Sequence, residues 1–174
     1  MAEKINPSIS TNFNIPNSSG TTAFMRAREF AYGELYVKDN TTETTLNSAD
    51  KVQVTDFDTN GNSLNCTPDQ SNSYITIKLT GKYLITLSIA IVSSAGAAHI
   101  ISVGIFKNAG VTQYNNVHGH RTMGNGTDTG SLSLSGIIDV TAGDTIELWA
   151  NTSSGSNRDV IFQDVNFSLV RLSA

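Results

Sequence analysis

The stretch "GKYLITLSI", residues 81–89, decides the fold. Its large apolar residues recur at every second position, the spacing of a β-strand with one buried face. Tyr83, Ile85, Leu87 and Ile89 are predicted to share that face, in a series that starts at Gly81. Thr86, Ser88 and Ala90 lie on the other face, which is therefore small and mild rather than charged. A strand of this kind can be covered on both faces.

The same two-residue period recurs on both sides of this stretch, with Gly, Asn and Asp clusters between the segments. The segments are "AYGELYV" (31–37), "KVQVTDF" (51–57), "YITIKL" (74–79), "HIISVGIF" (99–106), "SLSLSGIIDV" (131–140), "TIELWA" (145–150) and "VIFQDVNFSLVRL" (160–172). Short, regularly spaced strands without a long helical pattern predict an all-β, antiparallel jelly-roll sandwich of about ten strands.

Three of these segments resemble one family in the right order. The series Gly81-x-Tyr83-x-Ile85-x-Leu87-x-Ile89 resembles the G-x-Y-x-F-x-F core strand of the tumour-necrosis-factor-like jelly-roll superfamily, which includes the globular heads of the complement first component. "VTAGDTIELWA" (140–150) and "FSLVRL" (167–172) resemble its last two strands. The resemblance covers about residues 30–174 and implies a homotrimer of ten-stranded jelly rolls.

The sequence departs from the motifs of the animal members of this superfamily at several positions. Aliphatic residues replace the aromatic ones of the core strand, and Ser168 stands where a Gly usually follows the final Phe. The collagen-like or coiled stalk of the animal members is absent from the sequence. The resemblance therefore points to the microbial and viral members, and the chain looks like a phage head fibre, a capsid decoration protein or a fibre tip.

Composition excludes several classes of partner. Charged residues make up only 15% of the chain and the net charge is −4, without any basic run, so neither nucleic acid nor an anionic membrane is an expected partner. The nearly uncharged stretch 84–106 is interrupted by polar residues and alternates, which favours two strands over a spanning helix. Cys66 is the sole cysteine and is expected to be a buried thiol.

Residues 1–29 are expected to be an extended N-terminal arm, followed by the jelly roll at 30–174. Pro7, Pro16 and a Ser/Gly/Thr cluster interrupt regular structure there, although "AFMRAREF" (23–30) is compatible with one helical turn. The spaced apolar residues of the arm are predicted to anchor it on another protein. These residues are Ile5, Ile9, Phe13 and Ile15.

Candidate ligand-binding residues gather in one segment. His118 and His120 would face the same side of a strand and could share a transition metal, although Gly119 between them favours an exposed loop with two incidental histidines. The Gly-rich segment that follows could form a tip where Tyr114, His118, His120 and Asp128 bind a glycan or receptor, although a plain solvated loop is the favoured interpretation. No catalytic motif is present, so an enzyme is not expected and no cofactor is required.

The string D-x-D-x-N-G, formed by Asp56, Asp58, Asn60 and Gly61, begins like a calcium-binding hand loop. Such a loop needs a bidentate Glu at its twelfth position, where this chain has Thr67, and its flanks are strand-like. A looser calcium cage remains a minor alternative to a simple turn. In the turn, Asp58 and Asn60 bond to their own backbone and Gly61 adopts a positive φ.

Together these features predict a non-enzymatic structural protein on a virion surface. It would be a trimeric phage capsid decoration protein or short head fibre, anchored by its arm to the major capsid protein or another virion component. The alternative is a receptor- or glycan-binding tip of a fibre or bacterial adhesin, with a host surface glycan as its partner.

Overall fold

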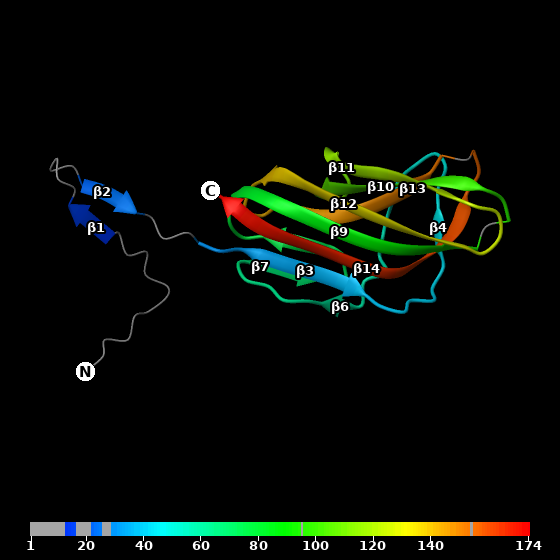
Figure 1. The fold of residues 1–174 in the computed structure, drawn as a ribbon, viewed down its shortest axis with the longest axis horizontal. Helices are drawn as coiled ribbons and strands as arrows, with labels where there is room; N and C mark the ends of the chain where they lie inside the picture. Colours follow the sequence, from blue (N-terminus) through cyan, green and yellow to red (C-terminus); the bar gives the residue numbers. More distant parts are fainter. Residues whose placement is uncertain (1–12, 17–21, 26–28, 95, 154) are drawn as a thin grey trace.

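The computed structural model describes residues 13–16, 22–25, 29–94, 96–153 and 155–174 (Figure 1). These residues form 14 strands, and no helix occurs among them. The prediction of an all-β, antiparallel sandwich is therefore confirmed. Across the same residues, no helix is long and apolar enough to cross a membrane.

The first sheet has the strand order β12–β9–β14–β3–β6, and the short strand β4 also pairs with β14. The central strands are long: β9 pairs with β12 along its whole length and with β14 on its other side. The strands are β3 (Tyr32–Val37), β4 (Thr44–Leu46), β6 (Thr59–Asn60), β9 (Gly81–Ser93), β12 (Asp128–Val140) and β14 (Arg158–Ser173).

The second sheet has the order β11–β10–β13–β8–β7, and the short strand β5 also pairs with β13. The strands are β5 (Val52–Gln53), β7 (Cys66–Asp69), β8 (Tyr74–Ile77), β10 (His99–Lys107), β11 (Thr112–Met123) and β13 (Thr145–Thr152). The chain passes repeatedly between the two sheets, which is the connectivity of a jelly roll. Among the described residues, the short strands β4, β5 and β6 bring each sheet to six strands.

The core lies between the inner faces of the two sheets. Tyr83, Ile85, Leu87 and Ile89 of β9 all have side chains less than 4% exposed, as their spacing predicts. The Tyr83 hydroxyl donates a hydrogen bond to the Leu79 carbonyl at 2.8 Å, which satisfies the polar end of this buried ring. Each buried Ile or Leu contributes about 1.5–3 kcal/mol to folding. Cys66 also lies in the core, and burial raises the pKa of its thiol to about 11.

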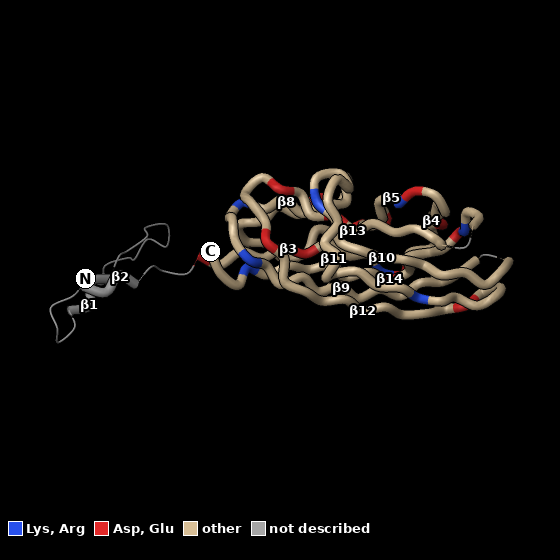
Figure 2. The backbone as a smooth tube through the Cα atoms, turned by 90° about the horizontal axis from the view of Figure 1, so that it is seen from above, with Lys and Arg blue, Asp and Glu red and all other residues tan. Residues whose placement is uncertain are grey.

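One side of the sandwich is closed by strands β11 and β12, which follow one another in sequence but belong to different sheets (Figure 2). Gly119 of β11 lies on the inner side of this junction, where a Cβ atom would come within 2.7 Å of the Leu134 side chain. A glycine is required because the two strands approach so closely there. Gly119 therefore lies inside strand β11 as a close-contact position, and the side chains on either side of it keep the alternation of a strand.

The N-terminal residues include a two-stranded hairpin, β1 (Phe13–Pro16) with β2 (Thr22–Met25). The "AFMRAREF" segment begins as strand β2, so the helical turn suggested for it is wrong at residues 23–25. Of the predicted anchoring residues, Phe13 and Ile15 lie in β1, whereas Ile5 and Ile9 lie outside the described residues. The boundary between an arm at 1–29 and a domain at 30–174 stays a prediction.

Candidate functional site

The outer face of the first sheet is built from the residues that alternate with the core. Three rows run across β12, β9, β14 and β3 in register. We call these twelve residues the serine face. The rows are Ile137–Leu84–Val170–Tyr32, Ser135–Thr86–Ser168–Glu34 and Ser133–Ser88–Asn166–Tyr36.

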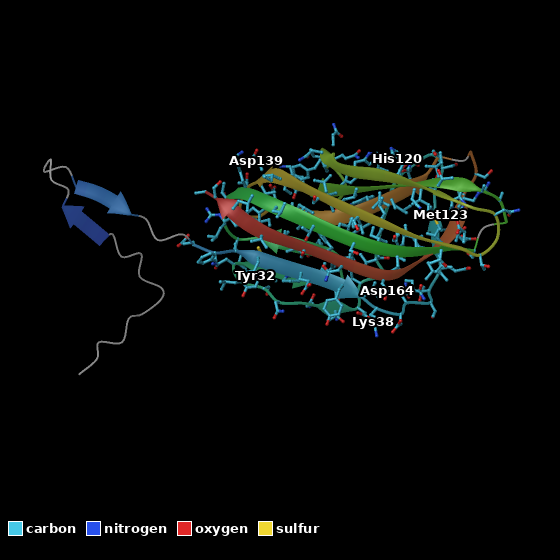
Figure 3. All side chains as sticks on the ribbon, in the orientation of Figure 1. Tyr32, Lys38, His120, Met123, Asp139 and Asp164 are labelled. Atoms are coloured by element: carbon cyan, nitrogen blue, oxygen red, sulfur yellow. The ribbon has the colours of Figure 1, made fainter. Side chains whose placement is uncertain are left out.

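The centre of the serine face, on β12, β9 and β14, carries mostly Ser and Thr side chains, and the face as a whole is nearly free of charge. Glu34 is its one carboxylate, and its Oε1 atom accepts a hydrogen bond from the Asn166 amide at 2.7 Å. Charge appears at the margin, where Lys82 and Asp139 form an ion pair at 2.6 Å. Figure 3 shows Tyr32 and Asp139 toward the same end of the sheet, near the C-terminus. Between Asp128 and Asp139, strand β12 carries no charged residue (Figure 2).

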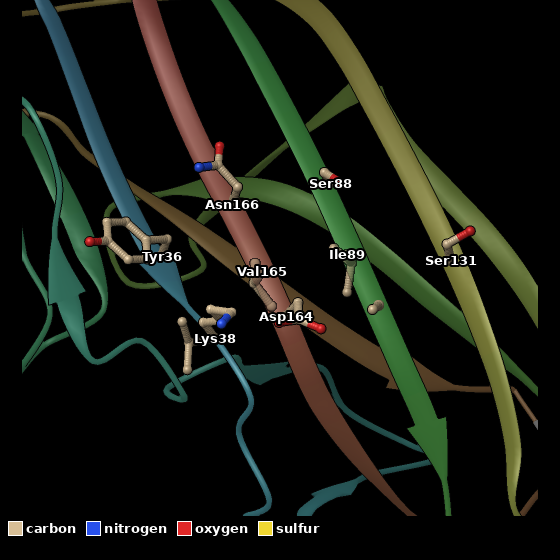
Figure 4. Close-up of a pocket in the computed structure, with 10 residues that line it drawn as sticks. Tyr36, Lys38, Ser88, Ile89, Ser131, Asp164, Val165 and Asn166 are labelled. Carbon is tan, nitrogen blue, oxygen red and sulfur yellow. The ribbon is translucent and has the colours of Figure 1, made fainter.

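Large apolar side chains are nevertheless exposed on this face. Ile137 is 52% exposed, Val170 46% and Tyr32 38%, and all three lie in one row. At the other end of the face lies an open depression of about 350 Å³, lined by Tyr36, Ser88, Asn166 and their neighbours on four strands (Figure 4). Lys38 and Asp164 lie at this depression. Exposed apolar rows bordered by polar groups are typical of interaction surfaces.

The outer face of the second sheet has a different character. One row across β11, β10, β13 and β5 reads His118–Gly104–Trp149–Gln53, and the next rows read His120–Ser102–Asn151 and Gln113–Phe106–Glu147. We call these ten residues the histidine face. It carries titratable, aromatic and amide side chains where the serine face carries hydroxyls.

His118 and His120 lie within strand β11, which settles the strand-or-loop alternative in favour of the strand. Their rings are 4.5 Å apart between centroids and nearly perpendicular. The Nδ1 atom of His120 is 2.8 Å from the Ser102 hydroxyl, which fixes that ring against β10. Burial lowers the pKa of His118, and the neighbouring His120 and Lys51 lower it further.

Glu147 is the buried acid of the histidine face, at 2% exposure. Its Oε1 atom accepts from the Ala109 N–H and the Thr145 hydroxyl, both at 2.8 Å. Its Oε2 atom accepts from the Trp149 indole at 2.9 Å and from the Gly110 N–H at 3.1 Å. Four donors therefore satisfy this carboxylate and fix the β10–β11 turn against the Trp149 ring.

The other two predicted tip residues lie apart from the histidine pair. Tyr114 packs against the core and donates its hydroxyl to the Asp139 carbonyl at 2.9 Å, and burial raises the pKa of Tyr114 to about 12. Asp128 is the first residue of β12 and accepts a hydrogen bond from the Gly124 N–H. Only His118 and His120 of the four predicted residues are therefore adjacent, and Tyr114 and both histidines lie in a strand rather than a loop.

The D-x-D-x-N-G string is part of a short strand pairing rather than a free turn. Asn60 belongs to β6, and its backbone N–H and side-chain oxygen exchange hydrogen bonds with Gln70 at 2.9 and 2.8 Å. The side chain of Asp58 accepts from the Thr59 hydroxyl at 2.7 Å. Neither side chain makes the predicted bond to its own backbone: Gln70 of a neighbouring loop is the partner of Asn60, and the hydroxyl of the next residue is the partner of Asp58.

Gly61 does not adopt a positive φ, so that part of the turn prediction is also wrong. Its reason is spatial, since a Cβ atom would overlap the Glu34 side chain. Asp56 accepts from the Thr44 hydroxyl at 2.8 Å, and burial raises the pKa of the Asp56 carboxyl. Among the described residues, no group of three or more His, Cys, Asp or Glu is arranged to hold a metal ion.

Sequence reasoning missed the partners of the histidines. Lys51 comes from the loop before β5, more than 60 positions before His118, and no local pattern connects them. Glu147 and Trp149 did leave a signal, because they alternate with the apolar residues of "TIELWA" and so had to point outward.

Comparison with known proteins supports the fold. No protein-family model and no curated protein sequence matches the chain. Among solved structures, the Eiger tumour necrosis factor from S. frugiperda superposes with a TM-score of 0.56 at 15% identity, covering 84% of this chain and 96% of that one. Murine APRIL at pH 8.0 superposes with a TM-score of 0.55 at 12% identity, covering 83% of this chain and 100% of that one. The chain thus has a tumour-necrosis-factor-like jelly-roll fold.

Proposed function

We propose that this chain is a non-enzymatic structural protein of a virion surface, which assembles as a homotrimer through its serine face. It would serve as a capsid decoration protein or short head fibre. The observation that carries the proposal is the nearly uncharged outer face of the first sheet, continuous over four strands.

The serine face suits a contact with further copies of the same chain. Its hydroxyl and amide groups can exchange hydrogen bonds across an interface, and few charges have to lose their hydration there. The row of Ile137, Leu84, Val170 and Tyr32 supplies apolar area to bury. Cyclic symmetry lets each copy cover part of the face of the next one, so that one sequence closes a ring of three.

The proposed role of the arm rests on its sequence. Its spaced apolar residues are proposed to bind the major capsid protein or another virion component; they are Ile5, Ile9, Phe13 and Ile15. The sandwich has a buried apolar cluster of its own, from Ala31 to Leu169, and we therefore expect it to fold without the arm.

The proposed trimer interface is tested with two variants, one on each outer face, in which an exposed aliphatic residue is replaced by Asp. Val170→Asp places a charge in the apolar row of the serine face, and Ile100→Asp places one on the exposed outer side of β10, where Ile100 is 40% exposed. Analytical ultracentrifugation should find the wild type and Ile100→Asp as trimers and Val170→Asp as a monomer. A monomeric wild type, or a trimeric Val170→Asp variant, contradicts the proposed interface.

The anchoring role is tested by deleting residues 2–29. The truncated chain should remain a trimer but no longer sediment with the capsid of its parent virion. Sedimentation of the truncated chain at wild-type levels contradicts the arm as anchor.

The second candidate function is a glycan-binding fibre tip or adhesin. One observation favours it: His118, His120 and the indole of Trp149 lie on the same outer face, away from the proposed trimer contact. Binding to an array of host surface glycans, lost in a His118→Ala variant that still forms trimers, would support this role.

A further inference from the structure

The histidine face carries a cluster of cationic groups from two separate segments. His118 and His120 project from β11 with their rings 4.5 Å apart. Lys51, from the loop before β5, bonds to Gln113, whose side chain lies over Gly104 next to that of His118. Gly104 of β10 lies beneath the cluster, where a Cβ atom would touch Gln113, His118 and Phe106 at 3.1–3.4 Å. The absence of a side chain at Gly104 thus lets these groups close over the strand.

Lys51 is held in place although it is exposed. Its Nζ atom donates to the Gln113 side-chain oxygen at 2.8 Å and lies 4.6 Å from the centroid of the Phe106 ring. A cation–π contact and a hydrogen bond together keep this ammonium over the sheet instead of extended into solvent. Its position is therefore prepared before any ligand arrives.

No ion pair joins the cluster to an acid among the described residues, where the ion pairs involve Lys38, Lys82 and Lys107. Asp50, the chain neighbour of Lys51, is exposed to solvent. Glu147 is the nearby carboxylate on this face, but four donors of its own occupy both of its oxygens. Burial lowers the pKa of His118, and the groups that lower it further are His120 and Lys51 rather than an acid.

We propose that Lys51, His118 and His120 bind the carboxylate of an acidic saccharide. The ammonium and the protonated imidazoles supply charge-assisted hydrogen bonds to the carboxylate, the stronger class of hydrogen bond. The amides of Gln113 and Asn151 can bond sugar hydroxyls, and the half-buried indole of Trp149 offers an apolar surface in the adjacent position. The site is complete in one chain, so it does not rest on the proposed trimer.

A transition metal is the competing ligand for the same two histidines. Neutral imidazoles two residues apart on a strand could both bind one ion. However, Lys51 bonds to Gln113 on the same face and would repel a cation, and the described residues supply no third His, Cys, Asp or Glu ligand. The two ligands respond oppositely to pH, because an anion needs protonated imidazoles whereas a metal needs neutral ones.

The experiment is an NMR titration of the full chain that follows the imidazole C–H resonances at constant ionic strength. Sodium glucuronate is the probe, glucose is the uncharged control and sodium acetate is the carboxylate without a sugar ring. Glucuronate should shift both His118 and His120, and should bind roughly tenfold more tightly at pH 5.5 than at pH 7.5. Saturating glucuronate should also raise the pKa of His118, since binding and protonation are linked.

Matched variants assign the effect to the cluster. Lys51→Gln and His118→Gln should each weaken glucuronate binding severalfold, whereas Lys78→Gln, which alters an exposed lysine outside both faces, should leave it unchanged. Circular dichroism and sedimentation show whether each variant retains its fold and assembly.

Three outcomes overturn the proposal. Absence of glucuronate-induced shifts at pH 5.5 removes the anion site, and equal binding of acetate and glucuronate removes the saccharide. Tight binding of Zn²⁺ that strengthens with rising pH and excludes glucuronate identifies a metal site instead. Each of these results is separable from the trimer test, because a monomeric chain still carries the complete cluster.

Discussion

The serine face and the histidine face lie on opposite sides of one core, and each crosses four strands in register. The serine face presents Ser, Thr and Asn around one carboxylate, with an exposed apolar row along its edge. The histidine face presents imidazoles, an indole and a buried acid with four donors. The same architecture therefore supports two chemically distinct surfaces, because alternate residues of a strand leave the core pattern untouched.

The difference indicates a division of roles between self-contact and ligand contact. Small uncharged side chains let the backbone of a second copy approach closely, and removing them from water costs little free energy. Rigid rings and prepositioned charges instead favour a small polar ligand, because little conformational entropy remains to be lost on binding. Matched substitutions on the two faces should therefore have unequal effects.

The largest inequality is expected for arginine substitutions. Ser88→Arg inserts a long cation at the middle of the central strand of the serine face, whereas Thr122→Arg places the same group on the outer side of β11. The Ser88 variant should sediment as a monomer at concentrations where the Thr122 variant is a trimer, because a buried unpaired charge is costly. If both variants remain trimers, the serine face is not the interface.

Glu to Gln substitutions should show a smaller difference, and here the variant on the histidine face should be the more affected one. Glu147→Gln turns one acceptor oxygen into an NH₂ group that faces two donors, and should lower the free energy of unfolding by about 2–3 kcal/mol. Glu34→Gln on the serine face keeps an acceptor for Asn166 in a half-exposed setting and should cost about 0.5 kcal/mol or less.

Urea denaturation at one fixed protein concentration measures both values, with trimer content checked beforehand. Equal losses for the two variants would mean that the four donors around Glu147 contribute no more than a surface contact does.

The sequence predicts those features of the two faces that depend on residues close together in the chain. The alternation in "GKYLITLSI" predicted both the buried Tyr83 series and the mild outward series of β9, because strand periodicity is local. The same rule predicts that His118 and His120 share a face once β11 is known to be a strand. Gly119 left this open, since only the contact with Leu134 of the other sheet explains its glycine.

What could not be predicted depends on contacts between distant segments. The residue types of the D-x-D-x-N-G string favour a turn, but pairing of β6 with β3 and the bonds between Asn60 and Gln70 decide its conformation. Here tertiary pairing overrides a local turn preference. Likewise, the hydrogen bond from Lys51 to Gln113 of β11 joins two segments that no local pattern connects, since the pairing of β5 with β13 brings Lys51 to this face.

The smallest expected effect is a pH dependence of stability that arises from His118 on the histidine face. The pKa of His118 is lowered in the folded chain, chiefly by burial and then by His120 and Lys51, from an ordinary value of 6.5. The unfolded chain therefore takes up this proton first as the pH falls, so stability is full above about pH 6.5 and declines below it. His118→Gln should flatten this part of the melting temperature against pH, while Thr122→Gln on the same strand should not. An unchanged profile in His118→Gln would show that burial, His120 and Lys51 together shift the titration of His118 too little to affect the stability of the fold.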